Sequence, residues 1–132
     1  MNKEEIQYVY SGRFDTAFLN ELYADDVETA AETFESSLNH LTTEIGNADI
    51  LFRNGDVESL RKLFHKIKPL FGYVGLLKVQ EKVQQFEDAC HAAGHAGDIR
   101  KNYEELNIQI SEASNIIRQE LIRMKMYLNV RA

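Results

Sequence analysis

Residues 63–75, with the sequence LFHKIKPLFGYVG, decide the fold of this chain. Around them, apolar residues recur every three or four positions, at 57, 60, 64, 67, 71 and 74, which predicts an amphipathic helix with one buried face. The stretch also contains the only proline of the chain, Pro69, and a proline either ends a helix or kinks it. Because the apolar spacing keeps its phase through Phe71 and Val74, we expect the helix to continue past the proline.

His65 falls on the polar face of this predicted helix, at about 100° of turn per residue. Its neighbours on that face, three or four residues apart, are Arg61, Lys68 and Gly72. A neutral imidazole in water is a nucleophile that can form covalent intermediates, and the two cations would oppose the charge of a phosphoryl group. Gly72, together with Pro69, would leave room for another protein to approach. The plainer interpretation is a solvated histidine on a basic helix face.

Residues 65–76 resemble the signature of histidine-containing phosphotransfer (HPt) domains. That pattern is a His, any residue, an aliphatic residue, a Lys, usually a Gly, and a second Gly ten positions after the His. Four residues match it in register: His65, Ile67, Lys68 and Gly75. Pro69 stands where the family most often has glycine, and Phe64 is larger than the small residue common before the histidine. The resemblance implies that His65 accepts and passes on a phosphoryl group, with Lys68 as its electrostatic support.

The rest of the chain predicts an all-α fold. Apolar stripes indicate a short helix from an Asp15 cap to about Tyr23, and a long helix from a capping box at Asp25 to about Arg53. After the central helix, Gly75 sets a turn into a fourth helix over residues 76–93, and Asp98 is expected to cap the last helix. Short connections between amphipathic helices predict an antiparallel up-down-up-down four-helix bundle with one additional N-terminal helix. HPt domains share this architecture.

The domain boundaries follow from the same stripes. Residues 14–130 are expected to form a single HPt-like bundle domain. Residues 1–13 show no clean period, and we expect a loosely packed or partly ordered lead-in, from which Ile6, Tyr8, Val9 and Tyr10 could lie against the domain.

Composition narrows the class of protein. The chain has 132 residues, 44% of them hydrophobic, and a net charge of −6, which disfavours nucleic-acid binding because phosphate backbones need a basic surface. There is no run long and apolar enough for membrane insertion and no apolar leader, so we expect a cytoplasmic protein. Cys90 is the only cysteine and falls in an apolar stripe, which predicts a small core residue.

Several chemistries have no support in the sequence. There is no glycine-rich phosphate loop, so the chain is not expected to be an autonomous kinase. Cys90, His91 and His95 invite a metal site, but the glycines around His95 indicate a helix end and no third ligand is evident. We therefore expect no cofactor on this chain. In the HPt family the Mg²⁺ for phosphoryl transfer comes with the partner receiver domain.

The leading hypothesis is a free-standing phosphorelay intermediate of two-component signalling. His65 would carry the phosphoryl group, Lys68 and Arg61 would stabilise its charge, and Pro69 and Gly72 would belong to the docking face and give access to it. The expected partners are receiver domains of response regulators or hybrid histidine kinases, and the protein is expected to be a monomer. The docking surface would include part of a neighbouring helix, for which the second is the candidate. Two alternatives stay open: a helical adaptor or scaffold whose histidine is never phosphorylated, and a bundle that binds a metal or small cofactor.

Overall fold

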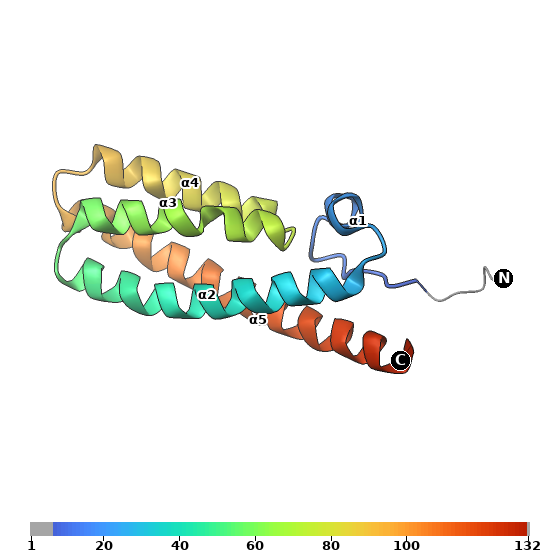
Figure 1. The fold of residues 1–132 in the computed structure, drawn as a ribbon. Helices are drawn as coiled ribbons and strands as arrows, with labels where there is room; N and C mark the ends of the chain where they lie inside the picture. The colour runs from blue at the N-terminus through green and yellow to red at the C-terminus, as the bar shows by residue number, and fades with distance from the viewer. Residues whose placement is uncertain (1–6, 132) are drawn as a thin grey trace.

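The computed structural model describes residues 7–131, which form five α-helices and one short 3-10 helix without any strand. Figure 1 shows their arrangement. The elements are α1 (Thr16–Tyr23), α2 (Val27–Arg53), α3 (Val57–Tyr73), α4 (Leu77–Ala92), η1 (Ala96–Ile99) and α5 (Arg100–Arg131). None of the helices in this described part is long and apolar enough to cross a membrane.

Helices α2 to α5 form the predicted antiparallel four-helix bundle, with α1 added at one end (Figure 1). Contacts run around the bundle in a closed ring: α2 packs against α3 and α5, and α4 packs against the same two helices. The connections between consecutive helices are too short for any other arrangement than antiparallel neighbours. Helix α3 continues through Pro69, as the unbroken apolar phase predicted.

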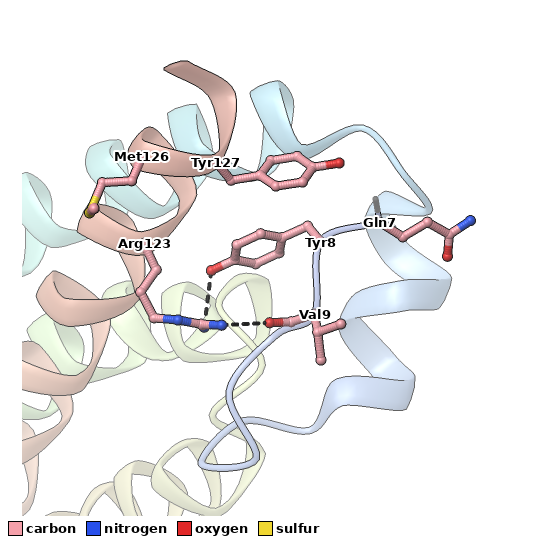
Figure 2. A pocket seen from close by; sticks show the side chains of 6 residues that line it. All are labelled: Gln7, Tyr8, Val9, Arg123, Met126 and Tyr127. Carbon is pink, nitrogen blue, oxygen red and sulfur yellow. Dashed lines mark hydrogen bonds between the residues drawn. The ribbon is translucent and has the colours of Figure 1, made fainter. Parts of the chain in front are cut away.

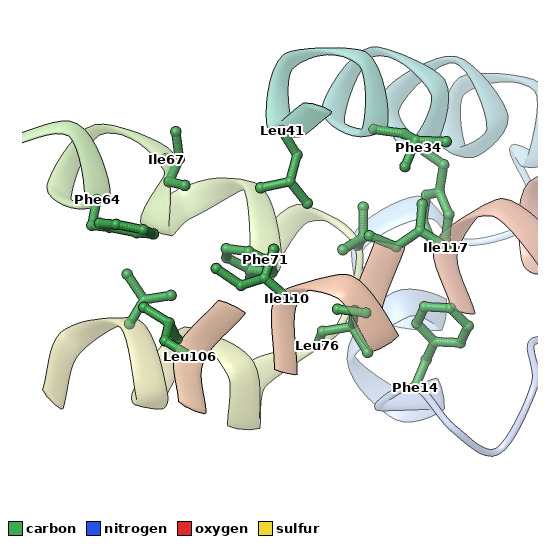
Figure 3. Packing of buried hydrophobic residues seen from close by; sticks show 14 of the residues in the cluster. Phe14, Phe34, Leu41, Phe64, Ile67, Phe71, Leu76, Leu106, Ile110 and Ile117 are labelled. Atoms are coloured by element: carbon green, nitrogen blue, oxygen red, sulfur yellow. The ribbon is translucent and has the colours of Figure 1, made fainter. Parts of the chain in front are cut away.

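The apolar stripes meet in one core that runs the length of the bundle. Figure 3 shows part of it, where side chains from α2, α3 and α5 interdigitate. The following hydrophobic side chains are almost completely buried: Leu19, Phe34, Leu41, Leu60, Phe64, Ile67, Phe71, Ile99, Ile110, Ile117 and Met124. Cys90 belongs to this core, as predicted, and burial raises the pKa of its thiol to about 11. The thiol is therefore protonated at neutral pH and unreactive as a nucleophile.

Aspartates cap the N-termini of the first three helices. The carboxylates of Asp15, Asp26 and Asp56 each accept a hydrogen bond from the backbone N–H three residues later, at 3.0, 3.0 and 3.1 Å. The prediction for Asp15 is confirmed. The prediction for α2 was wrong by one residue, because Asp26 rather than Asp25 holds the N-cap position.

The start of α5 also differs from the prediction. Asp98 does not cap this helix but lies inside η1, where its carboxylate accepts hydrogen bonds from the backbone N–H groups of Gly94 and His95. The cap of η1 is His95, whose ring nitrogen Nδ1 accepts from the Gly97 N–H at 3.0 Å. The Asp98 carboxylate therefore caps the backbone of His95, and the His95 ring caps that of Gly97, which gives His95 a structural role.

Helix α1 fills the space left by a difference in helix length. Helix α2 has 27 residues and α3 has 17, a difference of about 15 Å at 1.5 Å per residue. Leu19 of α1 is fully buried in that space, and the Phe14 ring packs 5.7 Å from the Phe34 ring of α2 (Figure 3). The short helix is thus an end wall of the core.

Two hydrogen bonds tie α1 to the end of α3. The Asp15 backbone N–H donates to the Gly75 carbonyl at 2.9 Å, and the Tyr23 hydroxyl donates to the Tyr73 carbonyl at 2.6 Å. Gly75 has a left-handed backbone with φ of 72°, and a Cβ at this position would lie 2.7 Å from Cγ of Leu19. The turn between α3 and α4 therefore requires glycine for its conformation and for its close approach to α1.

The residues before α1 contact α5 through Tyr8 and Tyr10, two of the residues that the sequence suggested could lie against the domain, whereas Val9 is exposed. Figure 2 shows Arg123 of α5 reaching the Tyr8 hydroxyl and the Val9 carbonyl, at 3.1 and 2.9 Å. Beneath them the buried Glu120 carboxylate accepts from the Tyr8 hydroxyl at 2.7 Å and pairs with Arg123. Tyr10 is buried as well, which raises its pKa to about 12. Residues 1–6, including Ile6, lie outside the described residues.

A pair of glycine substitutions would measure the contact between α1 and the turn after α3. Gly55 and Gly75 end their helices with nearly the same φ, 73° and 72°, but the space around a Cβ at Gly55 is open. We expect Gly55→Ala to cost about 1–2 kcal/mol of unfolding free energy, because left-handed backbone disfavours a side chain. Gly75→Ala should cost about 1–3 kcal/mol more, because it also displaces Leu19. Urea denaturation of both variants gives the difference, and equal losses would contradict the described contact.

Candidate functional site

His65 lies in the middle of α3 with its ring in solvent. Its side chain is 67% exposed, whereas the nearby Phe64 and Ile67 are fully buried in the core. Phe64 packs edge to face against Phe86 of α4, with 5.0 Å between ring centroids. The large residue before the histidine therefore anchors α3 against α4 and leaves the imidazole on the outside.

A carboxylate on the neighbouring helix holds one nitrogen of this ring. Nδ1 of His65 lies 2.8 Å from Oε1 of Glu87 on α4, and the Glu87 side chain is only 7% exposed. Because an ionised carboxylate can only accept, the geometry assigns the proton to Nδ1 of the neutral ring. The lone pair is then on Nε2, which has no hydrogen-bond partner among residues 7–131. The site presents a nucleophilic nitrogen to solvent in a fixed orientation.

Lys68 shares the same carboxylate. Its Nζ lies 2.9 Å from Oε2 of Glu87 and also donates to the side-chain oxygen of Gln84. Gln84 in turn donates to Asp88 at 3.0 Å. Lys68 is only 20% exposed, so its ammonium is held close to the surface of α4 beside the histidine. The two predicted residues, His65 and Lys68, are thus brought together through a third that the sequence did not indicate.

The remaining predicted cation is paired within its own helix. Arg61 makes two hydrogen bonds to Glu58, at 3.1 and 2.7 Å, and this guanidinium holds the pKa of Glu58 below its ordinary value. A role for Arg61 toward an anion at His65 stays a prediction, and it would require the side chain to leave Glu58.

The α2 side of His65 is also charged. Lys66 pairs with Glu44 of α2 at 2.5 Å, and this ammonium holds the pKa of Glu44 below its ordinary value. His40, one turn earlier on α2, lies 3.6 Å from the same carboxylate. Both neighbours of α3 therefore contribute a buried glutamate to the edges of the exposed face, Glu44 from α2 and Glu87 from α4.

Pro69 and Gly72, predicted to border the site, lie one and two turns after His65. Pro69 is exposed on the same side as the histidine. Gly72 is partly covered, because the side-chain nitrogen of Gln80 lies 3.0 Å from the position of a Cβ and donates to the Lys68 carbonyl at 3.4 Å. The absent side chain at Gly72 thus admits Gln80 of α4. Whether the glycine also gives a partner access stays a prediction.

Sequence reasoning missed Glu87 and Gln84. Glu87 directly follows Phe86 and lies four residues after Val83, at the edge of the apolar face of α4. A charged residue at such an edge is partly buried. That position was a usable signal for a buried, paired carboxylate. The partner of Glu87 could not be derived, because it depends on how α4 is rotated against α3.

No alternative metal centre is found in the described part of the chain. Nowhere in residues 7–131 do three or more His, Cys, Asp or Glu side chains gather so that they could hold an ion. His91 is exposed on α4, Cys90 beside it points into the core, and His95 caps η1.

Comparison with known proteins gives one match. The family model described as the Hpt domain matches residues 19–124, which include all of α2, α3 and α4. No curated protein and no solved structure matches the chain.

The hydrogen bond between His65 and Glu87 predicts a tautomer that can be measured. Nitrogen-15 NMR of the imidazole at a pH where the ring is neutral should show the proton on Nδ1 in the wild-type protein. Glu87→Ala should remove this preference, because no other described acceptor lies at Nδ1. Glu81→Ala removes an exposed carboxylate from the same helix and serves as the control, which should leave the tautomer unchanged. A wild-type ring protonated on Nε2 would contradict the assignment.

Proposed function

This chain belongs to the Hpt domain family, and we propose that His65 carries the phosphoryl group in a phosphorelay. The family consists of phosphotransfer modules of two-component signalling that work with receiver domains of response regulators, and its members are not kinases. In the finer proposal, His65 accepts the group from an aspartyl phosphate on one receiver domain and passes it to an aspartate on another. The observation that supports it most is the exposed Nε2, opposite a ring nitrogen bonded to Glu87.

The proposed transfer is a displacement at phosphorus. The lone pair of Nε2 forms an N–P bond while the P–O bond to the receiver aspartate breaks and the aspartate leaves as a carboxylate. The ring keeps its proton on Nδ1 and becomes cationic, and the Glu87 carboxylate beneath it offsets that charge. The reverse reaction passes the group to the second aspartate. Phosphoryl transfer of this kind asks mainly for positioning and charge stabilisation.

Lys68 is proposed to support the phosphoryl oxygens. Its ammonium lies between Gln84 and Glu87, the carboxylate that also bonds the histidine, and its flexible side chain would turn from there toward the phosphoryl oxygens. Mg²⁺ would come with the receiver domain, so this chain contributes only the nucleophilic nitrogen and charge. Arg61 is a second candidate cation, which is paired with Glu58 in this structure.

The docking face is proposed to be the exposed side of α3 with the adjoining edges of α4 and α2. Lys62 and Lys66 are exposed there, next to His65, and Pro69 extends the face toward the end of α3. Such a cationic face would suit a receiver domain, because its phosphorylation site is acidic. We further propose that the protein acts as a monomer in the cytoplasm, where receiver domains are found.

Substitution of His65 tests whether it carries the phosphate. Incubation with a phosphorylated receiver domain should add one phosphoryl group to the wild-type protein, detected by intact mass as an acid-labile, alkali-stable gain. His65→Gln should abolish the gain, because no other exposed imidazole among residues 7–131 has its ring held in this way. His91→Gln changes an exposed histidine of α4 and should be phosphorylated like the wild type. If His65→Gln still gains phosphate, or the wild type gains none, the adaptor hypothesis replaces the relay.

Substitution of Lys68 tests charge support separately from phosphate attachment. Lys68→Ala should slow transfer from a phosphorylated receiver roughly 10²-fold, as loss of a preorganised donor at a developing charge does. Lys66→Ala removes an equal charge from the same face, but Lys66 is paired with Glu44 and is 59% exposed, so it should change the rate only a few-fold. Stopped-flow or quenched-flow transfer rates give both values, and equal effects would contradict a specific role for Lys68.

A further inference from the structure

A groove lies between the start of α4, the middle of α5 and residues 12–15. It consists of two adjoining hollows of about 440 and 180 Å³. Four residues line both hollows and make them one continuous surface: Leu76, Lys78, Val79 and Ile116. The floor is mostly apolar, with Phe14 at one end and Ala113 at the other.

Cations line the rim of this groove. Lys78 and Lys82 lie four residues apart on α4 and are exposed, and neither side chain has an ion pair or hydrogen bond among residues 7–131. Like charges at this spacing on a helix repel each other. Arg13 adds a third cation, and its guanidinium donates to the neutral side chain of Gln119. Of the acidic residues on the rim, Glu112 is exposed, and the Asp15 carboxylate is used as the cap of α1. Three cations and two carboxylates give the rim a net charge of +1, in a chain whose net charge is −6.

The groove faces away from His65. Around the axis of α4, Lys78 lies about 180° and Lys82 about 140° from Glu87, the residue that bonds the histidine. A molecule in the groove would therefore leave the exposed side of α3 open. This surface is distinct from the docking face described above, and the function proposed for His65 makes no use of it.

We propose that this groove docks an acidic amphipathic helix of a partner protein. A helix laid between α4 and α5 would place its apolar residues against Val79, Ala113 and Ile116, in the manner of other helix-in-groove complexes. Carboxylates along its flank would meet Lys78 and Lys82, and the positive end of the α4 dipole lies at the same rim. A second copy of this chain is disfavoured as the occupant, because a two-fold interface would bring the same cations of both copies together.

The test uses the full chain labelled with nitrogen-15 and designed peptides of about four helical turns. The acidic peptide has leucines at helical spacing and glutamates on both flanks. A second peptide has lysines in place of the glutamates, and a third has the acidic composition in scrambled order. We expect the acidic peptide to shift the amide signals of Val79, Lys82 and Ile116, with little change around His65. The basic and scrambled peptides should bind at least about tenfold more weakly, and salt should weaken the acidic complex.

Charge reversal tests whether the cations on the rim are responsible for binding the acidic peptide. Lys82→Glu should weaken binding of the acidic peptide about tenfold. Lys101→Glu makes the same change at an exposed position of α5 outside the groove and should have little effect. Both substitutions are on the surface, so the variants should fold like the wild type.

Four results would overturn the proposal. They are absence of shifts at the groove with the acidic peptide, equal binding of acidic and basic peptides, equal losses for Lys82→Glu and Lys101→Glu, and groove shifts that appear on concentrating the protein alone. The last result would assign the groove to a second copy. A further titration uses dodecanoate below its micellar concentration. If dodecanoate shifts the groove signals and the acidic peptide does not, the groove binds an acyl chain and the proposal of a helical partner is wrong.

Discussion

The site depends on one buried carboxylate. Glu87 is hydrogen-bonded to the ring of His65 through one oxygen and forms an ion pair with the ammonium of Lys68 through the other, so a single side chain fixes both groups on the surface of α3. A buried carboxylate needs partners to offset the loss of hydration, and these two supply them. The arrangement holds only if α4 keeps its rotation against α3. The ring contact between Phe64 and Phe86, directly beneath the site, maintains that rotation.

Helix α1, which closes one end of the core, also helps to keep α4 in its position against α3. Helices α3 and α4 are shorter than α2 and α5. Without α1 and the residues before it, the core would therefore be open at the end where α3 turns into α4. Leu19 closes it against Gly75, and the bonds from Asp15 and Tyr23 hold the last turn of α3 in place. The turn that positions α4 relative to α3 is therefore set by residues far earlier in the chain.

The fold could be predicted from the sequence because its signals are local. Stripes at 3-4 spacing and glycines after α2 and α3 determine helices and turns without knowledge of their neighbours. The errors occurred where two neighbouring residues were equally able to cap a helix, as with Asp25 and Asp26, or where an extra element comes first, as with η1, which contains Asp98 and precedes α5. His65 and Lys68 were predictable from a resemblance and a helical wheel. The role of Glu87 and the contact of Gln80 with Gly72 were not predictable, because both depend on how the helices pack against each other.

The first described residues and the last turns of α5 lie together at one end of the bundle. The Tyr8 ring packs 5.2 Å from that of Tyr127, and Figure 1 shows both described ends of the chain on the side of α1. His65 lies well along α3, away from this end. A fluorescent reporter or an affinity handle joined to the chain at either described end would therefore lie at the α1 end of the bundle, and labelled forms of the protein could be built without obstructing the imidazole.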